Sequence, residues 1–116
     1  VESAKLYARE SVASVFALAG AKVLHSDGYP GWAPNPESQL LEVCCASHRD
    51  LFGSEAKVRA IHAGLECGLF LEKYPHLEMV SFGPTLRGVH SPDERLEIAT
   101  VDKFWKLLVE VVATIQ

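Results

Sequence analysis

The most regular pattern of apolar and polar positions lies near the C-terminus of the chain. Apolar side chains recur there every three or four positions, at Phe104, Leu107, Leu108, Val111, Val112 and Ile115. This spacing places them on one face of a helix. We expect Thr100 to cap this helix and its apolar face to pack on a sheet.

Three further segments predict helices, because apolar residues recur at helical spacing and a glycine stands at one end of each. Asn35 and Pro36 suit the start of the middle helix, as its N-cap and its first helical residue. The three helices are expected over residues 3–19, 35–52 and 64–73, with Gly20 and Gly53 ending the first two.

Short apolar or alternating segments between these helices predict strands over residues 21–26, 57–62 and 77–82. Residues 83–96 contain two prolines and two glycines, which is typical of a long loop. Strands separated by helices of this length favour an α/β fold, with helices layered over a largely parallel sheet.

Residues 27–36 are dense in turn-forming residues and mark a domain boundary or a crossover. The length of 116 residues suits one domain, or a domain and part of another. The chain opens with Val rather than Met, as expected of a piece cut from a longer protein or of a chain that has lost a tag.

Composition narrows the class of protein. With 11 Lys and Arg against 15 Asp and Glu, the net charge is −4, which argues against binding to nucleic acid. No apolar stretch approaches the ~20 residues that span a bilayer, and the N-terminus lacks the plan of a signal peptide. Cys44, Cys45 and Cys67 are odd in number and two are adjacent, which is typical of reduced thiols in a cytoplasmic protein.

Two glycine-rich segments follow predicted strands, where ligands bind in α/β sheets: residues 61–68 and 83–94. Each brings a histidine close to an acid. His90 has no helical face to explain it and is a candidate metal ligand or catalytic group, although an exposed loop histidine often has no role. His62 and Glu66 flank a turn and have a structural explanation as a sheet residue and a first-turn acid. Spacing alone thus supplies one convincing ligand, whereas a catalytic zinc takes about three from the protein.

Three motifs occur in order along the chain. They are Tyr29–Trp32 with Pro34–Pro36, then Ile61–Gly68, then Ser81–Pro84 with His90–Glu94. Together they resemble the C-terminal quarter of bacterial aminoacyl-histidine dipeptidases, also called beta-alanyl-histidine dipeptidases, and the resemblance covers essentially all 116 residues. The pairing of Gly-Leu-Glu-Cys-Gly with His-Ser-Pro-Asp-Glu makes it specific.

This resemblance implies a fold and an assembly. The family's enzymes are di-zinc exopeptidases with an α/β catalytic domain and an inserted lid domain that carries the dimer contacts. By resemblance, residues 1–28 form the last helix and strand of the lid, residues 29–36 the crossover, and residues 37–116 the C-terminal portion of the catalytic domain. A homo-oligomer is therefore expected.

The resemblance also implies site residues. His90 matches the family's last zinc ligand, and Gly64 and Glu66 match a loop that borders the substrate. Asp93 or Glu94 lies close enough in sequence to accept a hydrogen bond from the second ring nitrogen of His90. The other zinc ligands, the bridging Asp and the Glu general base lie upstream in the family, so no catalytic residue is expected in this segment.

The parent enzyme implied by the resemblance hydrolyses dipeptides with a C-terminal histidine, such as carnosine, using two zinc ions. This segment alone is expected to be inactive and not to hold zinc tightly. The alternative is a small stand-alone α/β module that binds a small ligand through its two glycine-rich loops, or serves in assembly, without catalysis. Neither alternative involves nucleic acid or a membrane.

Overall fold

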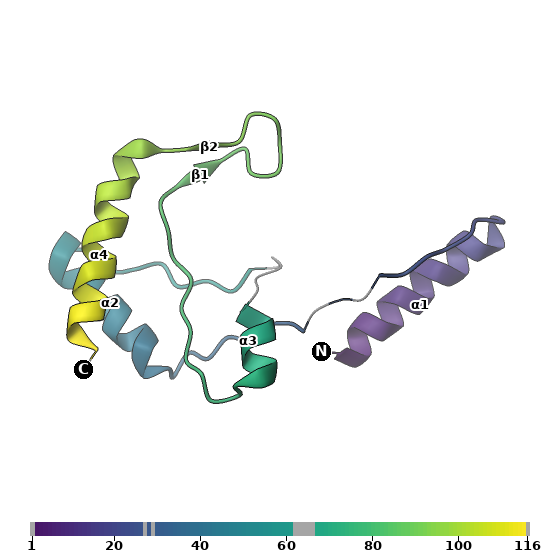
Figure 1. The fold of residues 1–116 in the computed structure, drawn as a ribbon, viewed down its shortest axis with the longest axis horizontal. Coiled ribbons are helices and arrows are strands. Elements are labelled where there is room, and N and C mark those ends of the chain that lie inside the picture. Colours follow the sequence, from purple (N-terminus) through teal and green to yellow (C-terminus); the bar gives the residue numbers. More distant parts are fainter. Residues whose placement is uncertain (1, 27, 29, 62–66, 116) are drawn as a thin grey trace. The chain divides into compact units, whose positions relative to one another are not determined.

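A computed structural model describes residues 2–26, 28, 30–61 and 67–115 of the chain (Figure 1). The chain divides into two compact units. Unit 1 consists of residues 1–34 and 62–77, and unit 2 of residues 35–61 and 78–116. Along the chain the elements are α1 (Glu2–Leu18), α2 (Gln39–Phe52), α3 (Cys67–Lys73), β1 (Leu86–Arg87), β2 (Arg95–Leu96), a short 3-10 helix (Ile98–Thr100) and α4 (Val101–Thr114).

Unit 1 contains α1 and α3. Helix α1 ends at Leu18, and the predicted stop Gly20 follows it with a φ of 77°, in the left-handed region that favours glycine. The N–H of Gly20 donates to the Ala17 carbonyl at 2.9 Å, and that of Ala21 donates to the Phe16 carbonyl at 3.0 Å. The predicted end of α3 at Lys73 is confirmed, whereas its predicted start at Gly64 lies outside the described residues.

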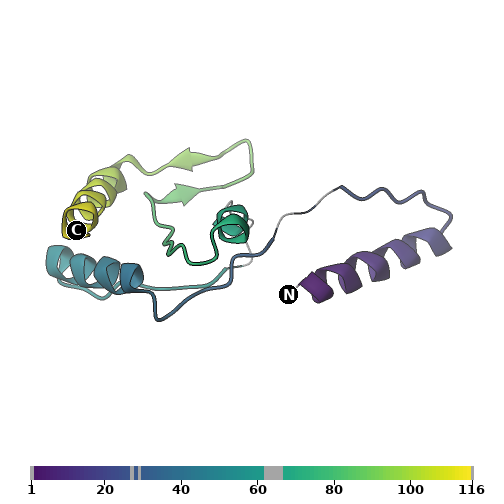
Figure 2. The ribbon, with the colours of Figure 1, turned by 60° about the horizontal axis from the view of Figure 1, so that its bottom comes forward.

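Unit 2 is built around the packing of α2 against α4, which lie side by side in Figures 1 and 2. Val111 of α4 is 4% exposed and Cys44 of α2 is 6% exposed, and these are the buried apolar residues of the described chain. The Phe104 ring extends this core to Phe82, with ring centroids 5.8 Å apart. The prediction that α4 packs on a sheet is therefore wrong, because the apolar partner of α4 is another helix.

Only part of the predicted apolar face of α4 is covered. Phe104, Leu107 and Leu108 are half-buried around Val111, whereas Val112 and Ile115 are 64% and 51% exposed. The face that packs on α2 is thus narrower than the stripe of six residues that the sequence predicts.

Helix α2 begins at Gln39, three residues later than it would with Asn35 as N-cap and Pro36 as first helical residue. Asn35 is not the cap: its side chain accepts from the N–H of Glu37 at 3.1 Å and so forms a turn before the helix. The N-cap is Ser38, whose hydroxyl accepts from the N–H of Leu41 at 3.3 Å. The helix ends as predicted at Gly53, which has a φ of 64°.

A carboxylate distant in sequence completes the N-terminus of α2. Glu78 accepts from the N–H of Gln39 at 3.2 Å and from that of Leu40 at 2.9 Å. Together with Ser38, it satisfies three of the donors that a helix start leaves without intrahelical partners. The bond from Leu40 contributes most to lowering the pKa of Glu78, and the bonds from Gln39 and Ser38 also lower it.

We expect Glu78→Gln to reduce the pH dependence of stability. A carboxyl group whose pKa is lower in the folded state stabilises the fold above its unfolded pKa of about 4.3, and this contribution is lost as the pH falls through the folded pKa. Glutamine does not titrate there. Urea unfolding from about pH 6 to about pH 3 should therefore show a smaller loss of stability in Glu78→Gln than in wild type. Glu37→Gln is the control, and an unchanged wild-type slope in Glu78→Gln would contradict the assignment.

The sheet of the described residues is a two-stranded antiparallel hairpin, in the segment predicted to be a long loop. Leu86 lies opposite Leu96 and Arg87 opposite Arg95. Glu97 lies near the paired arginines, and its Oε2 is 3.1 Å from Nη2 of Arg87. The sheet is thus not the parallel one that the alternation of helices and short apolar segments predicts.

The three predicted strands are wrong for the residues that can be described. Residues 21–26, 57–61 and 77–82 are in neither a helix nor a strand, and residue 62 lies outside the described chain. Alternating side chains favour an extended backbone, but a strand also needs a neighbour to share its hydrogen bonds. The hairpin meets that need locally, because Gly88 at φ 59° allows the chain to turn back.

Candidate functional site

His90 lies in the loop of the hairpin, between β1 and β2, and its side chain is exposed. Its φ is 64°, and it is the one non-glycine residue of the described chain with a positive φ. Residues with a Cβ disfavour this left-handed region, although His tolerates it better than most. The structure thus places the predicted metal ligand at a constrained position near the tip of the hairpin.

Hydrogen bonds made by Ser91 hold the loop together on either side of His90. Ser91 donates to the Gly88 carbonyl through its hydroxyl at 2.7 Å and through its N–H at 3.1 Å. The N–H of Asp93 donates to the Ser91 hydroxyl at 3.2 Å, and the N–H of Glu94 to the Ser91 carbonyl at 3.1 Å. Ser91 therefore ties together the two arms of the His-Ser-Pro-Asp-Glu motif.

Glu94 contacts His90, but not in the predicted way. Its Oε2 accepts from the main-chain N–H of His90 at 2.8 Å. The sequence predicts that Asp93 or Glu94 would accept from the imidazole ring. The role of Glu94 toward the His90 backbone was missed, because four residues of separation show that the groups can meet but not which atoms do.

The base of the hairpin is joined to the start of α4. The N–H of Glu97 donates to the Thr85 carbonyl at 2.9 Å, and the N–H of Thr85 donates to Oγ1 of Thr100 at 2.8 Å. Thr100 is the N-cap residue, as predicted, but its hydroxyl donates to the Glu97 carbonyl instead of capping a helical N–H. The hairpin that carries His90 is therefore anchored to the helix that forms the core of unit 2.

The residues of the described chain do not form a complete metal site. Within residues 2–26, 28, 30–61 and 67–115, no group of three His, Cys, Asp or Glu side chains is placed to hold a metal ion. His90 offers one exposed imidazole, which is a suitable donor for zinc. It thus fits a zinc ion as a single ligand, with the remaining ligands supplied from elsewhere.

The predicted substrate-binding residues Gly64 and Glu66, with His62, lie outside the described residues. Gly68, which closes the Gly-Leu-Glu-Cys-Gly motif, is described and buried in α3. A Cβ at this position would overlap the carbonyl of Pro30, so glycine allows this close approach within unit 1. The sequence indicates a close approach only through the presence of glycine at position 68, and it could not identify Pro30 as the neighbour.

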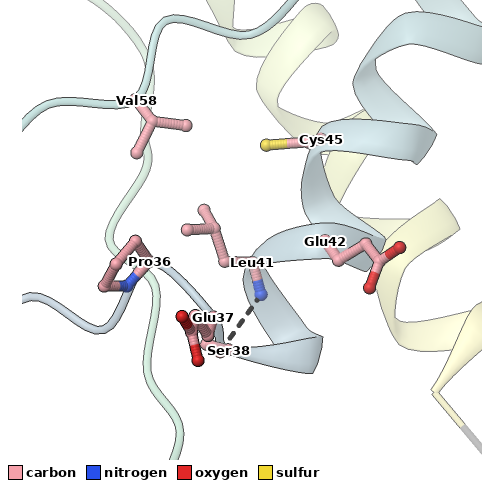
Figure 3. A pocket seen from close by; sticks show the side chains of 7 residues that line it. All are labelled: Pro36, Glu37, Ser38, Leu41, Glu42, Cys45 and Val58. Carbon is pink, nitrogen blue, oxygen red and sulfur yellow. Dashed lines mark hydrogen bonds between the residues drawn. The ribbon is translucent and has the colours of Figure 1, made fainter.

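Neither the cysteines nor the hollow beside the start of α2 forms a catalytic arrangement. All three thiols are free, and burial, together with the neighbouring Cys45, raises the pKa of the Cys44 thiol. An open hollow of about 440 Å³ lies beside the start of α2, where Leu41 points into the space between Pro36 and Val58 (Figure 3). Its lining is Pro36, Glu37, Ser38, Leu41, Glu42, Cys45 and Val58. Its buried hydroxyl, that of Ser38, already caps the helix.

Comparisons with known proteins identify close relatives of this segment. The chain is 42% identical over 115 residues to the cytosol non-specific dipeptidase of Escherichia coli strain K12, a match that covers 99% of this chain and 24% of that protein. The crystal structure of aminoacylhistidine dipeptidase from Vibrio alginolyticus matches with a TM-score of 0.74 and 40% identity, over 100% of this chain and 24% of that one. No family model matches the chain.

The chain thus spans about a quarter of the length of both relatives. The resemblance to aminoacyl-histidine dipeptidases drawn from the motifs is confirmed. The α/β fold class is confirmed as well, since the chain combines helices with a small sheet and matches a solved aminoacylhistidine dipeptidase as a whole. The division into lid, crossover and catalytic portions stays a prediction. In the parts of the chain that are described, none of the helices has the length and apolar character to cross a membrane.

Proposed function

We propose that this chain is part of a zinc-dependent dipeptidase, and that the enzyme hydrolyses dipeptides with a C-terminal histidine, such as carnosine. The observation that carries the proposal is identity of 40% or more, over essentially the whole chain, to two proteins that are both named dipeptidases. The name of the Vibrio protein specifies aminoacyl-histidine substrates, whereas that of the Escherichia protein specifies none. The preference for histidine is therefore proposed from the name of the Vibrio protein alone.

His90 is the residue through which this chain would hold zinc. Its imidazole is exposed at the hairpin and would bind one of two zinc ions through a neutral ring nitrogen. When bound, zinc polarises a peptide carbonyl and activates water for attack. The hairpin would hold the imidazole in place through its anchorage to α4, and Gly64 and Glu66 would border the substrate.

The proposal includes the location of the enzyme and its oligomeric state. The enzyme acts in the cytoplasm as a homo-oligomer, with no nucleic-acid or membrane partner. The apolar residues Leu6, Val12, Val15 and Phe16 of α1 are each more than half exposed, which is consistent with a helix covered by other parts of the assembly. The 116-residue chain alone would be inactive, because a single imidazole cannot place a catalytic zinc.

The test compares the full-length polypeptide that carries this chain with the 116-residue chain itself. We expect the full-length protein to hydrolyse carnosine faster than dipeptides lacking histidine, to lose activity with a chelator and to regain it with zinc. The short chain should neither hydrolyse carnosine nor retain zinc after dialysis. Equal rates on all dipeptides would contradict the histidine preference alone. A gene that encodes only about this length would favour the small stand-alone binding module. A purified full-length protein that binds dipeptides without hydrolysing them would contradict the dipeptidase proposal.

A further inference from the structure

His90 has an unfavourable backbone conformation. Its φ of 64° contrasts with the negative values of all other described residues that carry a Cβ. The direction of a Cα–Cβ bond relative to the chain depends on the backbone angles at that residue. If His90 relaxed to a negative φ, its imidazole would leave the hairpin in a different direction.

The contacts of the loop differ in what they restrain. The bonds made by Ser91 fix Gly88, Asp93 and Glu94 relative to one another. The N–H of His90 itself donates to the carboxylate of Glu94 at 2.8 Å. A hydrogen bond to an ionised acceptor is stronger than one between neutral groups, and this one acts on the residue whose φ is disfavoured.

We propose that Glu94 is a positioning residue for His90: its carboxylate holds the His90 N–H, maintains the left-handed backbone and so sets the direction in which the imidazole projects. The inference rests on the proposed function in one respect, namely that His90 is a zinc ligand. Glu94 acts here through the main chain of the ligand residue and touches neither the metal nor the substrate. Partners that hydrogen-bond the ligating side chains and so orient them typically change metal affinity by about 10- to 100-fold when removed, and we expect an effect of this order for Glu94.

The first experiment measures the backbone of His90 in the 116-residue chain by NMR. Secondary chemical shifts and the three-bond HN–Hα coupling report φ, and amide exchange reports the hydrogen bond to Glu94. We expect the left-handed signature in wild type, its loss with faster exchange in Glu94→Ala, and its retention in Glu94→Gln, because the amide oxygen can still accept. Asp93→Ala is the matched control: the hydrogen bonds described for Asp93 use its main chain, so removal of this neighbouring carboxylate should leave His90 unchanged. A wild-type chain without the signature, or a Glu94→Ala chain that keeps it, overturns the inference.

The second experiment measures zinc affinity in the full-length polypeptide by competition with a chelator. Glu94→Ala should weaken the binding of one zinc by about 10- to 100-fold. Glu94→Gln should restore most of the loss and Asp93→Ala should cause none, with the melting temperature of the zinc-free protein similar in all three. A loss in Glu94→Ala that glutamine does not rescue would overturn the positioning role. If His90→Ala leaves zinc binding unchanged, the ligand assignment fails instead, and the NMR result still decides whether Glu94 holds His90.

Discussion

Replacing His90 with alanine in the full-length polypeptide is expected to remove or weaken one zinc and to lower dipeptidase turnover by orders of magnitude. A catalytic zinc takes about three ligands from the protein, so the loss of one changes both the affinity for the metal and its placement relative to the substrate. The stability of the fold should change little, because the imidazole is exposed on a loop and lies outside the packed core of α2 and α4. Zinc content, carnosine hydrolysis and melting temperature measured on the same preparations test this expectation.

The matched control is His76→Ala. His76 is also an exposed histidine, but it lies in unit 1, outside the three motifs that resemble the dipeptidases. Its removal should leave zinc content and turnover at wild-type values. Full activity and full zinc content in His90→Ala would disprove the ligand assignment and remove most of the support for zinc chemistry at this hairpin. An equal loss in both variants would indicate general damage rather than a ligand.

Helices could be predicted from this sequence because their signals are local. The apolar spacing and the glycine stops lie within the helices or one to two residues beyond them, and both Gly20 and Gly53 take the left-handed conformation expected of them. Helix α2 starts later than predicted. Part of its N-terminal cap is the carboxylate of Glu78, which lies 38 residues from Leu40. No local pattern could indicate that a distant carboxylate would satisfy the first donors of the helix.

Strands could not be predicted in the same way, because they depend on partners that a local pattern does not contain. Residues 57–61 alternate as a strand should, yet they pair with no described segment. The hairpin of β1 and β2 has strands of two residues, too short for alternation to be visible. Its signals were the glycine and proline content of residues 83–96, which indicates turns but does not show that the chain folds back on itself.

At the candidate site, too, one feature could be predicted from the sequence and another could not. His90 could be selected as a candidate from its motif and its place outside any helix, and its side chain is exposed on the hairpin loop. Its left-handed backbone and the bond from its N–H to Glu94 could not be derived, since both depend on how the loop folds back in three dimensions. The sequence therefore indicated which residue is the candidate ligand, but not the backbone conformation that sets the direction of its side chain.

The second large effect is expected in the core of unit 2, where two neighbouring valines have opposite surroundings. Val111 is 4% exposed against α2, whereas Val112 is 64% exposed. Val111→Asp would place an unpaired carboxylate between the two helices, and we expect it to lower the free energy of unfolding by several kcal/mol. Val112→Asp carries the same cost of a negative charge near the C-terminus of a helix, about 0.3–1 kcal/mol, and Val and Asp have similar helix propensities.

The difference between these two variants isolates burial, because the substituted residue, the helix and the distance from its end are almost the same. Urea unfolding followed by circular dichroism gives the free energy of each, and Val111→Ala provides a milder change should Val111→Asp prevent folding. Alanine removes apolar contacts without adding a charge, so it should destabilise less than aspartate but more than Val112→Ala. If the aspartate variants at 111 and 112 were equally stable and the alanine variants did not differ either, α4 would not pack on α2 through Val111. The anchorage of the His90 hairpin to a fixed helix would then lose its basis as well.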